Sequence, residues 1–471
     1  MADTLSLLAT MPEPALFAFP PTGHAAPVPP PAEPNSILHP FNIPDSWFTA
    51  ALDAKVPITI AATYAVTVKL LNYYNKSRGN KAWAVSKTSA FKVLVILHNV
   101  FLAVYSAWTF VGMLGGMRRS IVSPMASTGL AGTADSFCRV FGAPGLGNSI
   151  YHDDTTGAWA TLAAGGGAFD NGMPSRAQGG RLWNEGLAYY GWIFYLSKFY
   201  EVIDTLIILA KGKPSSTLQT YHHAGAMLCM WAGIRFMSSP IWVFVLVNSF
   251  IHSLMYTYYT VTAFHIKVPV AIKRSLTTMQ ITQFLLGGSY TMLHSFVSYV
   301  VPMTVVNEVS VPVDAPSAPA TDAGALDAIR NLVFGDAAGH AKTAPGGSIV
   351  ESTLNAQTVH VTQPCIMTTG ETFAIWLNVL YLAPLTYLFM SFFIASYLKR
   401  SNAAQKTNKI NGKGSSLASR RLSNEVTLAE KAGWDAAKGV QKEVYGANGS
   451  AISDDDSPKK GKAAKGSKRR A

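Results

Sequence analysis

Ionisable side chains occur inside a stretch of this chain that is otherwise apolar. Lys198, Glu201, Asp204 and Thr205 fall within eight residues, and positions 198, 201 and 205 share one face of a helix. An ionisable group at the centre of a bilayer costs at least about 2.5 kcal/mol on insertion scales. We therefore expect these groups to face one another, water or a substrate.

Three following apolar stretches carry polar stripes at the same helical spacing. A stripe of this kind can bond a neighbouring helix, and Lys198 with Glu201 can be a structural ion pair. Taken together, the four stripes predict one polar chamber enclosed by consecutive helices. The further residues of these stripes are Gln219, His222 and His223; Asn248, His252, Met255, Tyr256 and Tyr259; and Thr277, Gln280 and Gln283.

The histidines of these stripes allow two kinds of chemistry. Neutral imidazole, with a reference pKa near 6.5, serves as a base, a nucleophile or a metal ligand. Membrane di-iron desaturases and hydroxylases draw many histidines from several boxes, whereas this chain has 11 in all. Five of them, His24, His39, His152, His340 and His360, fall in expected loops or flanks. This leaves His222, His223 and His252 for a membrane site, with His98, His265 and His294 as further candidates. There is also no Glu-x-x-His pair of the di-iron bundle type, so we expect no metal and no cofactor, and a di-iron oxygenase stays an alternative.

The elements that must position these residues are membrane helices. The 471 residues are 49% hydrophobic and only 14% charged, against about 25% charged in ordinary domains. A helix needs about 20 apolar residues to cross a bilayer, and seven stretches are long enough. They are Ala54–Tyr73, Lys92–Leu114, Gly186–Lys211, Ser216–Phe236, Pro240–Phe264, Thr277–Val301 and Thr372–Leu398. The predicted fold class is an all-α integral membrane protein with seven transmembrane helices.

Basic residues predict the orientation of these spans. The loops after the first, third and fifth spans are basic, and so is the tail, which has 17 Lys or Arg against 7 Asp or Glu from Lys399 to Ala471. The positive-inside rule makes that side cytosolic and the N-terminus lumenal, although Arg118 and Arg119 lie on the other side. We expect no nucleic-acid partner, and the tail's last residues resemble an endoplasmic reticulum retrieval signal.

Three regions follow from this reading. Residues 1–53 are Pro-rich and expected to be disordered, since 11 of the 26 prolines lie before residue 45. Residues 54–398 form the seven-span body, with long lumenal loops at 115–185 and 302–371 whose composition favours disorder. Residues 399–471 form a basic, disordered tail. Cys138 and Cys365 lie one in each lumenal loop, where they can form a disulfide or stay as free thiols.

The four stripes, taken in order, resemble the signatures of the ELO family of very-long-chain fatty acid elongases. The resemblance is close from about residue 184 to 286 and loose over the rest of the body. A family member of this kind would be a 3-ketoacyl-CoA synthase of the endoplasmic reticulum membrane, with six helices in a barrel around an acyl-chain tunnel. The matching sequences are KFYEVIDT (198–205), QTYHH (219–223), NSFIHSLMYTYY (248–259) and TTMQITQF (277–284).

The resemblance implies that acyl-CoA and malonyl-CoA are joined with loss of CO₂ and CoA, without a cofactor. The bilayer and the reductases and dehydratase of the elongation cycle would be the partners. The alternatives are the di-iron oxygenase and a seven-span lipid-binding or transport protein without catalysis. Cytosolic cations are suited to CoA phosphates, and the candidates are Lys198, Lys211, Lys213, Lys267, Lys273 and Arg274.

One residue departs from the family pattern. The box usually begins with His, and here that residue is Gln219, which cannot take a proton at neutral pH. This feature and Asn248–His252 resemble elongases of polyunsaturated substrates from algae and protists. We expect His222 to attack the thioester, with His223 as the alternative nucleophile. His252 and Asn248 would serve the enolate, while Glu201 and Asp204 would set histidine tautomers.

Overall fold

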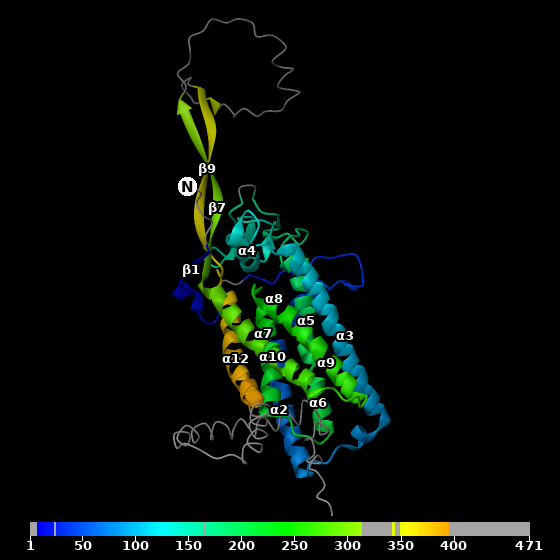
Figure 1. Ribbon diagram of the computed structural model, residues 1–471. Helices are drawn as coiled ribbons and strands as arrows, with labels where there is room; N and C mark the ends of the chain where they lie inside the picture. The colour runs from blue at the N-terminus through cyan, green and yellow to red at the C-terminus, as the bar shows by residue number, and fades with distance from the viewer. Residues whose placement is uncertain (1–6, 23–24, 164–165, 313–341, 344–348, 395–471) are drawn as a thin grey trace, which may run out of the picture. The chain divides into compact units, whose positions relative to one another are not determined.

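The computed structural model describes residues 7–22, 25–163, 166–312, 342–343 and 349–394 (Figure 1). It divides into two compact units. The first unit comprises Met1–Glu33, Gly115–Ala188 and Leu293–Phe373. The second comprises Pro34–Leu114, Tyr189–Met292 and Ala374–Ala471, and it holds all four polar stripes.

The second unit is helical. Two of its helices are interrupted, one at Glu201 and the other by a π-helical turn over Phe244–Asn248. The helices drawn in Figure 1 from this unit, four of which extend beyond it, are α1 (Asp45–Ala51), α2 (Lys55–Ser77), α3 (Ser89–Ser120), α5 (Ala188–Tyr200), α6 (Val202–Ala210), α7 (Thr217–Arg235), α8 (Ile241–Val243), η4 (Phe244–Asn248), α9 (Ser249–Ala263), α10 (Val270–Leu293) and α12 (Thr369–Phe393), with the short 3-10 turn η2 (Ala84–Lys87).

Within the described residues, three helical segments are long and apolar enough to cross a bilayer. They are α3, the run Ile241–Ala263 that joins α8, η4 and α9, and Thr369–Ser391 of α12. The helices α1 and α2, bent by 51° at their junction, pass the same test as a pair. The break at Glu201 leaves α5 and α6 too short to span alone, and polar side chains lower the hydropathy of α7 and α10. The structure is thus mostly helical and of membrane type, while the seven-span barrel stays a prediction.

The sixth expected span, Thr277–Val301, is wrong in its boundaries. The helix α10 begins at Val270 and ends at Leu293, and the strand β7 begins at Val297. The segment from Val297 to Val301 is rich in β-branched and aromatic residues, which fit a pleated surface. Periodicity cannot distinguish a helix from a strand within a continuous apolar run. The expected span therefore joins the end of α10 to the start of β7.

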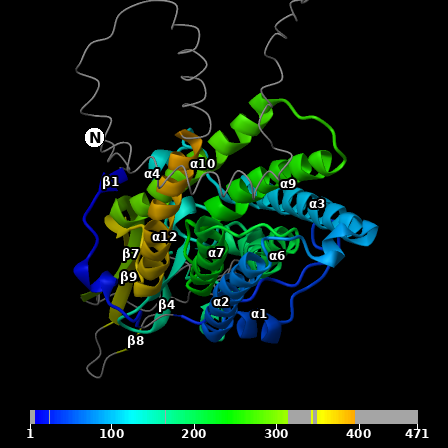
Figure 2. The same ribbon diagram turned by 90° about the horizontal axis from the view of Figure 1, so that it is seen from below.

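The helices α6 and α7 pack against α2. Tyr64 and Val68 of α2 form a buried cluster with Leu209 of α6, and Figure 2 shows the three helices next to one another. Further along α2, the Asn75 amide donates to the Leu209 carbonyl at 2.8 Å and accepts from Trp83 Nε1 at 2.7 Å. The C-terminal half of α2 thus holds the end of α6.

The first unit contains the strands, which the predicted all-α class did not include. Its sheets have the strand orders β1-β7-β9-β8, β2-β3-β4 and β5-β6. The long strands β7 and β9 are antiparallel, from Ser298 opposite Pro364 to Pro312 opposite Val350. The elements are β1 (Leu7–Ala9), η1 (Pro14–Phe17), α4 (Gly129–Cys138), β2 (Phe141–Gly142), β3 (Ser149–Asp153), β4 (Ala158–Thr161), β5 (Phe169–Asp170), β6 (Met173–Pro174), η3 (Trp183–Leu187), η5 (His294–Phe296), β7 (Val297–Pro312), β8 (Lys342–Thr343) and β9 (Ile349–Pro364).

The disorder expected for the loop 115–185 is therefore wrong over its described residues. A buried ion pair joins Arg181 Nη2 to Asp135 Oδ2 at 2.7 Å, and the Tyr299 hydroxyl donates to Asp135 Oδ1 at 2.9 Å. Burial raises the pKa of Tyr299, so the phenol remains a donor at neutral pH. Composition did not reveal this order because it depends on a few long-range polar contacts.

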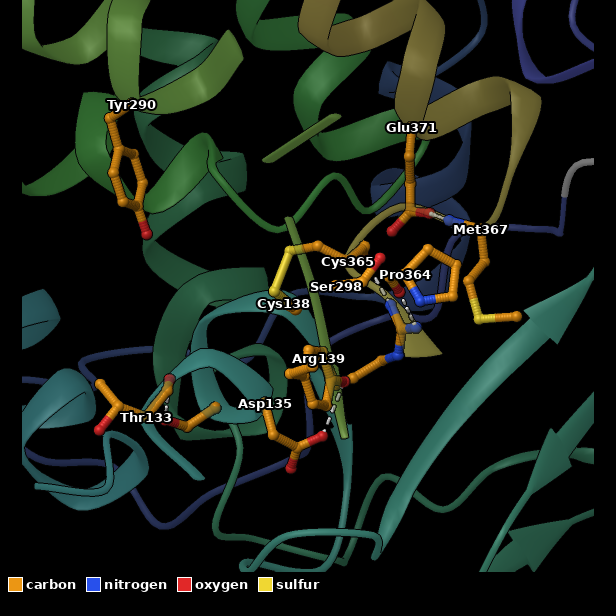
Figure 3. The surroundings of a disulfide bond; sticks show 12 residues. Thr133, Asp135, Cys138, Arg139, Tyr290, Ser298, Pro364, Cys365, Met367 and Glu371 are labelled. Atoms are coloured by element: carbon orange, nitrogen blue, oxygen red, sulfur yellow. Dashed lines mark hydrogen bonds between the residues drawn. A yellow bond between two sulfur atoms is a disulfide. The ribbon is translucent and has the colours of Figure 1, made fainter. Parts of the chain in front are cut away.

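A disulfide joins the two loops. Cys138 at the end of α4 bonds Cys365 after β9, with Cα atoms 4.9 Å apart. Figure 3 shows Arg139 beside this bond, where its guanidinium donates to the carbonyls of Cys365 and Pro364. Of the two possibilities that the sequence left open, a disulfide or two free thiols, the structure has the disulfide. It connects residues 227 positions apart in the chain.

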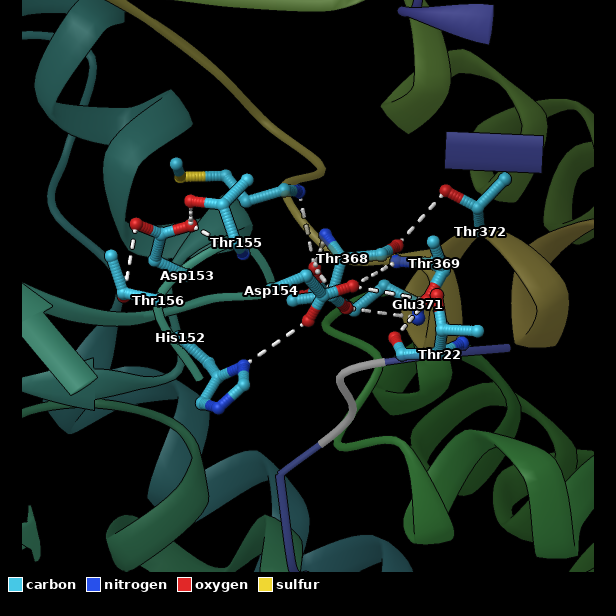
Figure 4. Close-up of polar contacts among 11 residues, drawn as sticks. Thr22, His152, Asp153, Asp154, Thr155, Thr156, Thr368, Thr369, Glu371 and Thr372 are labelled. Atoms are coloured by element: carbon cyan, nitrogen blue, oxygen red, sulfur yellow. Dashed lines mark hydrogen bonds and ion pairs between the residues drawn. The ribbon is translucent and has the colours of Figure 1, made fainter. Parts of the chain in front are cut away.

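The N-terminus of α12 is capped from the loop after β3. Asp154 Oδ2 accepts from the backbone N–H of Thr369 at 2.8 Å and from its hydroxyl at 3.0 Å. The other oxygen of Asp154 lies 3.1 Å from His152 Nδ1, and Glu371 accepts from the backbone N–H of Thr368 at 3.2 Å (Figure 4). These contacts satisfy helix N–H groups that have no partner inside the helix.

The Pro-rich N-terminal segment is also ordered over its described residues, contrary to the expectation for residues 1–53. In the first unit, Trp183 Nε1 donates to the carbonyl of Val28, which is 2% exposed. In the second unit, the hydroxyls of Tyr189 and Tyr190 donate to the carbonyls of Phe41 and Leu38. The backbone carbonyls of an extended Pro-rich segment remain able to accept hydrogen bonds. Here the aromatic side chains donate to them. The basic tail from Lys399 and its retrieval-like end lie outside the described residues.

Candidate active site

The break between α5 and α6 carries a buried ion pair. Lys198 Nζ lies 2.6 Å from Glu201 Oε1 and 3.9 Å from the centre of the Phe194 ring. Lys198 and Glu201 are 4% and 3% exposed. The pair fits the i, i+3 spacing read from the sequence. It also removes Lys198 from the residues available for CoA phosphates, because its charge is buried and compensated.

Asp204 binds His98, a histidine that lies outside the four polar stripes. His98 of α3 is buried, and its Nε2 lies 2.8 Å from Asp204 Oδ1 and its Nδ1 3.3 Å from the hydroxyl of Tyr200. The hydroxyl of Tyr256 donates to the other carboxylate oxygen of Asp204 at 2.6 Å. Because a carboxylate accepts, it fixes a proton on His98 Nε2. Asp204 therefore sets the tautomer of His98 rather than that of a box histidine.

Gln219 lies against the second histidine of its box. Its amide nitrogen is 2.9 Å from Nε2 of His223 and 3.5 Å from the hydroxyl of Thr205. The Thr205 hydroxyl is in turn 2.9 Å from the hydroxyl of Tyr64 on α2. Ser216, at the N-cap of α7, accepts from the backbone N–H of Gln219 at 3.0 Å. With the amide nitrogen as donor, the lone pair of His223 Nε2 is occupied.

His222 points to a different neighbour. Its Nδ1 lies 2.9 Å from the hydroxyl of Tyr381 on α12, and the same hydroxyl donates to the backbone carbonyl of His222 at 2.9 Å. Unlike His223, which is 6% exposed, His222 is only partly buried. Within the part of the chain that the structure describes, Nε2 of His222 has no hydrogen-bond partner. The two adjacent histidines therefore differ in which nitrogen remains available.

The third histidine faces the ion pair from the next helix. His252 of α9 is 7% exposed, and its Nδ1 lies 3.9 Å from Glu201 Oε1. Asn248 ends the π-helical turn η4, one turn before His252. A π turn adds one residue to a helix and occurs often at functional sites. It places the Asn248 side chain, which is partly buried, at a widened turn beside the histidine.

The remaining stripe residues lie around this group. The amide of Gln280 on α10 lies 3.3 Å from the sulfur of Met255, and the rings of Tyr256 and Tyr259 are in edge contact at 5.8 Å. Gln283 is buried in α10 at 6% exposure. Taken in pairs, the stripes of α5–α6, α7, α9 and α10 contact one another as one chamber requires.

Comparison with known proteins settles the family. Residues 49–405, about three quarters of the chain, match the ELO family, described as the GNS1/SUR4 family. The chain belongs to the ELO family. No solved structure matches it.

Several curated fatty acid elongases match part of the chain. Fatty acid elongase sre1 of Dictyostelium discoideum is 35% identical over 151 residues, which cover 32% of this chain and 52% of the relative. Very long chain fatty acid elongase 3 of Homo sapiens is 31% identical over 110 residues, or 23% and 41% of the two chains. Fatty acid elongase 2 of Trypanosoma brucei brucei is 32% identical over 119 residues, or 25% and 44%. This ELO chain thus aligns with about half or less of each of these relatives.

The cations expected to bind CoA phosphates occupy two loops of this ELO protein. Lys211 caps the end of α6 and is exposed, and Lys213 follows in the loop to α7. Lys267 is exposed in the loop before α10, and Lys273 and Arg274 lie in its first turns. These five cations thus lie in loops or near helix ends, whereas Lys198 is buried.

Sequence spacing missed the partners that come from other helices. His98, Tyr64 and Tyr381 contact site residues more than a hundred positions away. Spacing rules relate residues on one helix only, and none of the three belongs to one of the four polar stripes. Within the described ranges, no group of three or more His, Cys, Asp or Glu side chains is arranged to hold a metal ion.

Proposed function

We propose that this ELO protein is a condensing enzyme of fatty acid elongation. It would join a long-chain acyl-CoA, in our proposal a polyunsaturated one, to malonyl-CoA and release 3-ketoacyl-CoA, CO₂ and CoA. The family supports fatty acid elongation, and the names of the relatives agree with it. The observation that carries the proposal is the unequal pair His222 and His223, of which only His222 keeps an available Nε2.

The first half of the reaction is acyl transfer to His222. Its Nε2 lone pair attacks the thioester carbonyl carbon, the C–S bond breaks, and CoA leaves as a thiolate. The acyl-imidazolium then loses its Nδ1 proton, and the thiolate takes up one proton to become the CoA thiol. The acyl group is then held as an acyl-imidazole, which divides one difficult step into two easier ones. Gln219 holds His223 beside it and takes no proton.

The second half forms the carbon–carbon bond. Malonyl-CoA loses CO₂, and the electron pair of the broken C–C bond becomes that of an enolate. The α-carbon of the enolate attacks the acyl carbonyl carbon, and the C–N bond to Nε2 breaks. The imidazole regains the one proton lost in the first half, which restores His222. Asn248, at its π turn, and His252, near Glu201, are suited to stabilise the enolate oxygen or move a proton.

The proposed setting is the endoplasmic reticulum membrane. The seven helices would cross it, six of them around the acyl chain, with the N-terminus lumenal and the C-terminus cytosolic. The disulfide of the first unit supports a lumenal place for that unit, because disulfides persist in oxidising compartments. Under the topology predicted from the basic loops, the five loop and helix-end cations would meet CoA in the cytosol. The product would pass to the reductases and dehydratase of the cycle.

The test uses the full chain in microsomes that lack their own elongases. Malonyl-CoA is supplied with saturated, monounsaturated and polyunsaturated long-chain acyl-CoAs, and 3-keto products are measured. We expect products two carbons longer, the highest rates with polyunsaturated chains, and loss of product in His222→Ala. No product from any acyl-CoA, with folded protein, contradicts the proposal. A fully active His222→Ala beside an inactive His223→Ala would move the nucleophile to His223.

A further inference from the structure

The hydroxyl of Tyr381 contacts His222 at two atoms. It lies 2.9 Å from the ring nitrogen Nδ1 and 2.9 Å from the backbone carbonyl oxygen. A carbonyl only accepts, so the single hydroxyl proton is donated to that oxygen. The contact with Nδ1 is then a hydrogen bond only if Nδ1 carries a proton and the hydroxyl oxygen accepts it. The other tautomer would set two acceptors against each other at hydrogen-bond distance.

This arrangement determines the reactive nitrogen. In a neutral imidazole only one nitrogen carries a proton, and the partner of one nitrogen sets the state of the other. With the proton on Nδ1, the Nε2 atom of His222 keeps its lone pair. The same logic gives the orienting residue of a catalytic triad its effect.

The ring of Tyr381 packs closely against α7. A Cβ atom added at Gly225, three residues after His222 on α7, would lie 2.2 Å from Cε2 and 2.4 Å from Cδ2 of that ring. The hydroxyl of Tyr221 donates to the backbone carbonyl of Tyr381 at 3.1 Å, and the two rings are 5.4 Å apart. Two residues of α7 other than His222 thus fix Tyr381, which is itself buried.

We propose that Tyr381 is a positioning residue that holds His222 in the tautomer with a free Nε2. The proposal rests on the proposed function, because it concerns the nucleophile of that reaction. Tyr381 touches neither thioester nor enolate in this role, and its effect is on how fast His222 takes the acyl group. Binding of acyl-CoA should not depend on it.

The test compares Tyr381→Phe with Tyr195→Phe. Tyr195 on α5 is a matched control, since it is buried and its hydroxyl also donates to a backbone carbonyl, that of Ala51, at 2.8 Å. Acyl-enzyme formation from acyl-CoA without malonyl-CoA is followed by intact-protein mass spectrometry, and kcat and KM are measured separately. We expect Tyr381→Phe to lower the acylation rate and kcat by about 10-fold to 100-fold with KM unchanged, and Tyr195→Phe to leave both rates within about twofold.

A second measurement separates tautomer control from a general effect on structure. In the Tyr381→Phe background, His222 is replaced by Nδ1-methylhistidine, whose Nε2 always keeps its lone pair when neutral. Recovery of the acylation rate supports the proposal. Equal rates for the unmodified chain and Tyr381→Phe, equal losses in the two Tyr variants, or no recovery with the methylated ring would each overturn it. Absence of product from the unmodified chain would instead count against the proposed function.

Discussion

Lys198 Nζ lies 2.6 Å from Glu201 Oε1, and the two residues flank the point at which α5 ends and α6 begins. Both side chains are almost completely buried. Removing one partner of such a pair leaves an uncompensated buried charge, which costs about 3–5 kcal/mol. The break between α5 and α6 therefore contains two buried charges of opposite sign that compensate each other.

We therefore expect Lys198→Met to destabilise the protein far more than the double variant Lys198→Met/Glu201→Gln. The single change should lower the free energy of unfolding by about 3–5 kcal/mol, and the double change by clearly less, because no charge is left unpaired. Thermal unfolding in detergent measures both. Additive effects of the two single changes would show that the ion pair contributes no coupling.

A second prediction concerns His98 and Asp204. His98→Leu removes the Nε2 donor to Asp204 and leaves that carboxylate with Tyr256 as its described side-chain donor. A buried acceptor that loses its partner costs about 1–3 kcal/mol, and the Asp204 side chain is partly buried, with 20% exposed. We therefore expect a loss of stability at the lower end of that range and a lower condensation rate.

Tyr200→Phe is the matched control for His98→Leu. It removes only the hydroxyl at 3.3 Å from the other nitrogen of His98, and Tyr200 itself is exposed. Its effect on stability should stay within about 0.5 kcal/mol. Equal losses of stability in the two variants, measured by thermal unfolding, would mean that the contact of His98 with Asp204 does not stabilise the protein more than the contact with Tyr200.

A third prediction concerns the disulfide Cys138–Cys365. Cys138→Ser and Cys365→Ser should each lower stability by about 2–5 kcal/mol, the usual cost of losing a native disulfide. A reducing agent should lower the unfolding temperature of the unmodified chain and leave that of either variant unchanged. Cys229→Ser, which changes a buried free cysteine, should keep the sensitivity to reduction. Insensitivity of the unmodified chain would contradict the bond.

Contacts inside single helices could be predicted from the sequence. The spacing of Lys198 and Glu201, and of Gln219 and His223, placed each pair on one helix face, and the structure has each pair in contact. Four stripes in order also indicated the family that the comparison shows. The chemical roles assigned to these residues stay predictions.

Contacts between distant segments could not be predicted in this way. Tyr381 and His98 lie in helices that carry none of the four polar stripes, and their partners depend on how α12 and α3 pack. The end of the sixth span was misplaced because the β-branched run after Leu293 is as apolar as the helix before it. The order of the loop 115–185 depends on Asp135 and Arg181, two residues in a segment of small and polar composition.

The last prediction concerns the loop between α6 and α7. Gly212 has a φ of +73°, and a Cβ atom there would lie 2.6 Å from the carbonyl oxygen of Asn80 and 2.7 Å from the nitrogen of Ala82. Asn72 of α2 holds the same loop by two hydrogen bonds of 2.8 Å to the backbone of Ser215. Gly212→Ala should therefore displace the loop, with the neighbouring Lys211.

Gly79→Ala isolates this effect. Gly79 has a similar φ of +67°, but nothing lies within 4 Å of its added Cβ atom, so both variants carry the backbone cost of about 1–2 kcal/mol and only Gly212→Ala adds a backbone collision. We expect Gly212→Ala to lose more stability and to raise KM for acyl-CoA, because the cations of this loop are moved. Gly79→Ala should leave KM unchanged. A KM that responds equally to both variants, measured beside thermal unfolding, would show that the close approach of Gly212 to residues 80–82 does not matter for CoA binding.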